Sequence, residues 1–157
     1  MEKAIRIGIS FGLTSGIITT LGLMIGLSIG TNSKIAVVGG ILTIAIADAF
    51  SDALGIHISQ ESNRSSSKSV WLSTLSTLGS KFFFALTFLI PVLLFELSTA
   101  VIISVVWGLF SLGLISYFIA KKQDKKPFGV IMEHIVIAII VIIITFFVGK
   151  WISLIFI

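Results

Sequence analysis

Long apolar runs separated by short polar segments make up almost the whole chain. The five runs lie at about residues 4–30, 35–59, 70–95, 99–120 and 128–150. Several of them reach or exceed the roughly 20 residues that a helix needs to cross the hydrocarbon core of a bilayer. The first run is also far longer than the core of a signal peptide. The pattern predicts an all-α, polytopic membrane protein with five transmembrane helices in a single domain, residues 1–157.

Polar segments between the runs predict the connections and the orientation. Thr31 to Lys34 and Glu96 to Ser98 are tight turns, whereas 60–69 and 121–127 are solvated loops. Most basic residues lie beside the N-terminus or in these two loops: Lys3, Arg6, Arg64, Lys68, Lys121, Lys122, Lys125 and Lys126. The opposite side has only Lys34 and Lys150. The positive-inside rule therefore predicts a cytoplasmic N-terminus and an external C-terminus.

Composition narrows the function classes. The chain is 56% hydrophobic and 11% charged, against about 25% charged in soluble domains. It has no cysteine, so disulfides and thiolate metal sites are excluded. The net charge of +4 is expected to meet lipid phosphates rather than nucleic acid. We find no nucleophile–base pairing or HExxH spacing, so we expect neither an enzyme nor a tightly bound cofactor.

Small residues form a stripe along the first predicted helix. Its glycines include Gly8, Gly12, Gly16, Gly22 and Gly26, in two runs of GxxxG type. Such a stripe allows another helix to approach closely. Packing within one subunit is the ordinary interpretation; a dimer seam or the lining of a transport path are the alternatives.

Asp48 and Asp52 are the strongest functional candidates. They lie one helical turn apart in the middle of the second apolar run, on one face together with Ser51. A charge at that depth is costly, by about 2.5–3.5 kcal/mol on insertion scales. Two adjacent carboxylates also repel, so we expect at least one to be protonated unless Lys81 or a cation pairs with them. His57 is expected on nearly the opposite face and thus outside this site.

Other polar or soft side chains are accessory candidates. Lys81 lies well inside the third predicted helix and can pair with an aspartate or snorkel to the interface. Glu61 is the sole acid of the 60–69 loop, and Glu133 and His134 lie in the first turns of the last helix. Met24 offers a soft ligand in the first helix. The ordinary interpretation is interfacial solvation for Glu133 and His134, and lipid or packing contact for Met24.

Several segments resemble the vacuolar iron transporter-like (VIT-like) family. Residues 10–16 followed by 22–27 resemble its first-helix pattern DGLxxxxxLxxGL, and 47–55 resemble its second-helix pattern AGAxSMAxG. Phe88 to Pro91 is similar to a GALIPLLP segment in its third helix, and the basic loop with Pro127–Phe128 and Val148 to Lys150 is similar to its end. The five-helix count and the cytoplasmic N-terminus also agree.

The resemblance implies a homodimer that exports Fe²⁺ or Mn²⁺ from the cytosol in exchange for protons, along a path between subunits. This chain departs from the family at the site. Phe11 stands where the family has a helix-1 aspartate, Asp52 where it has a methionine and Asp48 where it has a glycine. The short 60–69 loop also lacks the glutamate-rich cytoplasmic domain of some members.

We therefore expect a minimal family member in a prokaryotic cytoplasmic membrane that moves a divalent transition metal, iron or manganese. Asp48, Asp52 and Ser51 would bind the ion, because oxygen ligands suit such harder cations. The alternative is a non-transporting membrane interaction protein, in which Asp48, Asp52 and Lys81 are helix–helix contacts. Phe11 and Asp52 put iron itself in question as the substrate.

Overall fold

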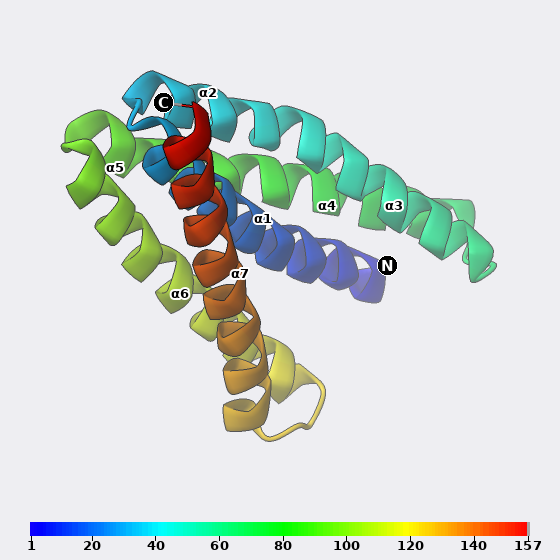
Figure 1. The fold of residues 1–157 in the computed structure, drawn as a ribbon. Helices are drawn as coiled ribbons and strands as arrows, with labels where there is room; N and C mark the ends of the chain where they lie inside the picture. Colours follow the sequence, from blue (N-terminus) through cyan, green and yellow to red (C-terminus); the bar gives the residue numbers. More distant parts are fainter. Residues whose placement is uncertain (157) are drawn as a thin grey trace.

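The computed structural model describes residues 1–156, and within them every regular element is helical (Figure 1). The elements are α1 Glu2–Thr31, α2 Lys34–Thr43, η1 Ile44–Asp48, α3 Ala49–Ser62, α4 Ser67–Thr87, α5 Leu89–Leu94, α6 Leu97–Lys122 and α7 Pro127–Phe156. The label η1 denotes a π-helical turn that joins α2 to α3 without a break.

Five helical segments are long and apolar enough to cross a membrane. They are Glu2–Thr31, Lys34–Ser62, Ser67–Leu94, Leu97–Lys122 and Pro127–Phe156. The second combines α2, η1 and α3, and the third combines α4 and α5. The prediction of an all-α chain with five helices long and apolar enough to span a membrane is confirmed.

Short capped turns separate the segments, as the polar breaks predict. After α1, Asn32 adopts a left-handed conformation with φ 48°, and its N–H bonds the Ser28 carbonyl. The Ser33 side chain then accepts from the N–H of Ala36 and begins α2. Ser66 begins α4 in the same way by accepting from Ser69. These caps satisfy backbone groups that helix ends leave unpaired.

The third segment is interrupted shortly before Pro91. Proline lacks an N–H, and its ring clashes with the carbonyl four residues earlier, that of Thr87. In the structure α4 ends at Thr87 and α5 begins at Leu89. The Thr87 hydroxyl bonds the Phe84 carbonyl and accepts from Trp107 Nε1.

The last helix is longer than the apolar pattern indicates. We expect it over about 128–150, followed by an apolar tail, but α7 continues to Phe156. Residues 151–156 contain no proline or glycine, so nothing in the local sequence ends the helix at Lys150. The expected boundary is therefore wrong at this end.

Helix α1 lies at the centre of the molecule and packs against α4, α7 and α6. Its glycines make these approaches close. A Cβ on Gly8 or Gly12 would collide with α4, and one on Gly22 would lie 3.0 Å from Val141 of α7. These contacts lie within one chain, in line with the ordinary interpretation of the stripe. The stripe serves two partner helices, α4 in its first half and α7 in its second.

The apolar core lies around the second half of α1. Its fully buried members come from α1, α2, α5, α6 and α7: Ile17, Leu21, Met24, Val37, Ile41, Val92, Leu112 and Ala138, with Phe88 beside them. Toward the start of α1 the helices separate, and Figure 1 shows α6 and α7 diverging from α1, α3 and α4 at that end. The apolar core therefore does not extend to the first half of α1.

Candidate functional site

A buried lysine joins the two aspartates. Lys81 of α4 is 0% exposed, and its Nζ lies 2.5 Å from Asp48 Oδ2 and 2.5 Å from Asp52 Oδ2. The same Nζ donates to Ser15 Oγ of α1 at 2.9 Å. We call these four residues the Lys81 cluster. It links α1, α4 and the η1–α3 junction.

The glycines of α1 provide the room for this lysine. A Cβ on Gly16 would lie 3.3 Å from Lys81 Cγ, and one on Gly12 would lie 3.2 Å from the Lys81 backbone nitrogen. The lysine stem therefore passes directly over the small-residue stripe. The stripe does more than bring two helices together, because it also leaves space for a buried cationic side chain.

The two aspartates are held differently. Lys81 donates a hydrogen bond to Asp52. Its contact with Asp48 meets the distance for an ion pair, but its angles do not make a hydrogen bond. Asp48 Oδ2 is thus a buried oxygen without a hydrogen-bond partner within residues 1–156. Asp48 is also the more accessible side chain, at 32% against 19% for Asp52.

The cluster lies near the middle of the spanning segments. Ser15, Asp48 and Lys81 each fall close to the centre of their segment, and Asp52 is one turn farther along α3. Both ends of each segment are therefore about ten or more residues away, which corresponds to roughly 15–20 Å of helix. In a bilayer, these charged groups would lie near the middle of the hydrocarbon core.

The π-helical turn η1 ends at Asp48. One additional residue in a helical turn interrupts the regular pattern of backbone hydrogen bonds, and such turns occur frequently at functional sites. Sequence reasoning treats residues 35–59 as one regular helix and misses this feature. No residue in Ile44–Asp48 is proline or glycine, so the sequence contains no conventional signal for the irregularity.

The structure does not bring Ser51 into the cluster. Ser51 is exposed on α3, and none of the cluster's hydrogen bonds involves it. Ser15 takes the hydroxyl position instead, from a different helix. Sequence reasoning counts Ser15 only as a small residue of the stripe, and its depth in the first span is the one signal that could have indicated a polar role.

The other accessory candidates are dispersed. Met24 is fully buried in the apolar core. His134 Nδ1 lies 2.7 Å from Ser116 Oγ between α7 and α6, and Glu133 is exposed. Glu61 is exposed at the end of α3. Within residues 1–156 no three His, Asp or Glu side chains gather in a metal-binding group.

His57 is apart from the aspartates, as expected, but it also faces α4. Its Nδ1 lies 3.0 Å from Thr74 Oγ1, and its Nε2 lies 3.5 Å from Glu61 Oε1. Its ring packs edge-on against Trp71. These contacts hold the α3–α4 hairpin together near its loop.

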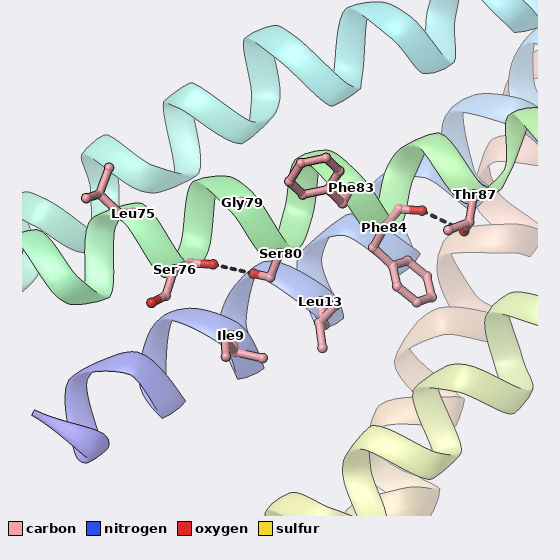
Figure 2. Close-up of a pocket in the computed structure, with 9 residues that line it drawn as sticks. All are labelled: Ile9, Leu13, Leu75, Ser76, Gly79, Ser80, Phe83, Phe84 and Thr87. Carbon is pink, nitrogen blue, oxygen red and sulfur yellow. Dashed lines mark hydrogen bonds between the residues drawn. The ribbon is translucent and has the colours of Figure 1, made fainter.

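A shallow groove between α1 and α4 offers little chemistry. Its lining is mainly apolar and includes Ile9, Leu13, Leu75 and Phe83 (Figure 2). The Ser80 hydroxyl in it bonds carbonyls of its own helix. The groove is therefore typical of a surface that contacts lipid tails or another apolar helix.

A larger cleft of about 740 Å³ lies between the first half of α1 and the end of α6. Its lining is mixed, with three basic side chains near its rim and apolar ones deeper in. It lies on the side of α1 that carries Phe11 and Thr14, whereas Gly12 and Gly16 face Lys81.

Comparisons with family models, with curated proteins and with solved structures find no match for this chain. The resemblance to the vacuolar iron transporter-like family therefore stays a prediction from short motifs.

Proposed function

We propose that the protein is a proton-coupled cation transporter in which the Lys81 cluster is the exchange site. The observation that carries this proposal is the fully buried Lys81 Nζ, 2.5 Å from both Asp48 and Asp52 near the middle of the spans. Ionisable groups at that depth are costly, and they are typical of ion pathways and proton relays.

Charge counting supports exchange. One ammonium and two carboxylates leave the ionised cluster with one negative charge. A proton would neutralise it, and we place that proton on Asp48, whose side chain is the more accessible of the two. A cation arriving at Asp48 would displace that proton. Binding of cation and of proton at the cluster would thus exclude each other.

A divalent ion requires a further step. Two carboxylates and one divalent ion are neutral only when Lys81 is neutral too, so Lys81 would give up its own proton. Buried lysines shift their protonation readily, and Ser15 is placed to keep a hydrogen bond to the neutral amine. Electroneutral exchange would then release two protons for each divalent ion, one from Asp48 and one from Lys81.

We propose Mn²⁺ or Fe²⁺ as the substrate, since oxygen ligands suit these ions. The resemblance to the vacuolar iron transporter-like family supports the same choice. The chain would have its N-terminus in the cytoplasm and export the ion.

A homodimer is supported by Asp48, because a carboxylate 32% exposed at mid-span requires cover that a second copy can supply.

The test is ion uptake by purified protein in liposomes, with a metal-sensitive dye and a pH-sensitive dye read together. We expect Mn²⁺ flux with opposing proton flux, and Asp48→Asn or Asp52→Asn to lower both at least tenfold. Glu61→Gln and Glu133→Gln are matched controls, because these carboxylates are exposed and outside the cluster. Unchanged flux in both Asn variants would refute the assignment.

The second candidate is a membrane interaction protein in which the cluster acts only as a structural clamp, meaning that it holds helices together and moves no ion. It is favoured by the fact that Lys81 joins three helical segments within one chain. It predicts that the Asn variants unfold more easily while wild type moves no cation in either direction. The two dyes distinguish the candidates, because a clamp gives no signal in either channel.

A further inference from the structure

The 740 Å³ cleft at the start of α1 has the polarity of an amphipathic ligand. At one end its rim carries Lys3 and Arg6 from α1 and Lys122 from α6. All three are exposed, and within residues 1–156 none of them forms an ion pair with a carboxylate. Glu2 is the one acid of the lining, so the rim remains positive overall.

Deeper in, the walls become apolar. Leu13 is ten residues beyond Lys3 on α1, and Ile115 is seven residues before Lys122 on α6. At about 1.5 Å per residue these positions lie roughly 10–15 Å below the basic rim. Phe11 and Phe118 add aromatic surface between the two levels. The gradient from charge to hydrocarbon runs along the helices, as it does in a lipid leaflet.

Two polar side chains deeper in the cleft, Thr14 and His134, are paired within the protein. Thr14 Oγ1 bonds the Ser10 carbonyl of its own helix, and the ring of His134 is paired with Ser116 Oγ. Neither arrangement presents an unpaired charge to the apolar part of the cleft. The fixed charges that face a ligand are those at the rim.

We propose that the cleft binds one anionic phospholipid, with its phosphate against Lys3, Arg6 and Lys122 and an acyl chain between α1 and α6. Basic pockets between spanning helices bind acidic headgroups. The volume lies within the roughly 300–1,000 Å³ typical of ligand sites. The bound lipid would occupy the cleft between α1 and α6, on the side where α6 and α7 diverge from α1 (Figure 1). This site is separate from the Lys81 cluster and does not depend on transport.

The experiment uses the full chain in detergent, with native mass spectrometry and thermal unfolding during titration of phosphatidylglycerol. The test variant is Lys3→Gln/Arg6→Gln/Lys122→Gln. We expect it to bind phosphatidylglycerol on the order of a hundredfold more weakly, because each basic residue contributes about 1 kcal/mol near an anionic headgroup. Arg64→Gln/Lys68→Gln/Lys125→Gln is the matched control, with equal charge loss outside the cleft, and it should retain affinity within about twofold.

Three results would overturn the proposal. Equal loss in the control variant would show general attraction to basic residues. Equal binding of phosphatidylcholine would show that charge is not recognised, and equal protection by inorganic phosphate would assign the rim to free phosphate.

Ile119→Trp, which fills the apolar wall and retains every charge, should also displace the lipid. This variant decides the question if the triple variant does not fold, and lipid retention by it would refute the acyl-chain position.

Discussion

Lys81 concentrates the unusual chemistry of this chain in one side chain. It is fully buried, and it contacts Asp48, Asp52 and Ser15 from three helical segments. A buried ion pair adds little to stability compared with apolar packing, but removal of one partner leaves an unpaired charge. The cluster is therefore retained at a cost that a purely apolar core would avoid, which is why we assign it a function.

Lys81→Met is expected to destabilise the protein by about 3–5 kcal/mol, because it leaves two partly buried carboxylates near mid-span without a counter-charge. Methionine preserves most of the stem volume, so packing against Gly16 changes little. Thermal unfolding in detergent measures the effect.

The triple variant Lys81→Met/Asp48→Asn/Asp52→Asn is the control for charge, because it removes all three ionised groups together. It should recover most of the stability lost by Lys81→Met alone. If Lys81→Met is as stable as wild type, or if the triple variant recovers nothing, the electrostatic account of the cluster is wrong.

At the residue scale, sequence reasoning identifies the two aspartates because carboxylates in an apolar run are conspicuous. It leaves Lys81 with two alternatives, pairing or snorkelling, since a lysine at that depth is compatible with both. Only its depth in the first span could have indicated a polar role for Ser15 among the small residues of its helix. The choice of Ser15 over Ser51 depends on which helices are neighbours, and one helix alone cannot reveal that.

Among the helices, α1 has the most demanding packing. Its first glycines approach α4 so closely that a methyl group has no room, and the same approach accommodates the Lys81 stem. Any side chain added there displaces α4 and with it the cation of the cluster. Helix packing and site geometry are thus coupled through the same glycines.

Gly12→Ala should destabilise the protein by about 1–3 kcal/mol, because the added Cβ would overlap Ser80 Oγ and approach the Thr77 carbonyl. Gly79→Ala in α4 is the matched control, since a Cβ there meets nothing within 4 Å. The control should be neutral or stabilising by up to about 1 kcal/mol, because alanine is the better helix former.

Thermal unfolding of both variants in the same detergent checks this pair. Equal effects at the two positions would mean that glycine matters only through helix propensity. The close α1–α4 approach would then not hold in the membrane.

The elements differ in how well they follow from local sequence. Pro91 marks the α4–α5 break directly, because the missing N–H and the ring clash are local effects. Apolarity alone does not mark the end of α7, since a helix continues until something stops it. The η1 turn has no local marker either, and its position beside Asp48 is known only from the structure.

For the whole molecule, the arrangement of polar connections supports one orientation. The N-terminus, the α3–α4 loop and the α6–α7 loop carry most of the basic residues. The α1–α2 and α5–α6 turns carry few. We propose that the first set faces the cytoplasm.

A cysteine scan in intact cells tests the orientation without background labelling, because the native sequence has no cysteine. Asn63→Cys and Gln123→Cys should be protected from an impermeant thiol reagent until the membrane is opened. Thr31→Cys and Ser98→Cys should react at once. All four positions are exposed, so burial within the protein does not produce the protection. The reverse pattern would invert the proposed direction of export.

The sequence by itself determines that this chain consists of five long apolar helices and that two carboxylates lie within one of them. These properties follow from span length and residue type, which are local. The tertiary structure alone decides that Lys81 lies between Asp48 and Asp52, and that Ser15 completes the contact. Those pairings depend on the rotation and crossing of separate helices, because a side chain's partners come from elements distant in the sequence.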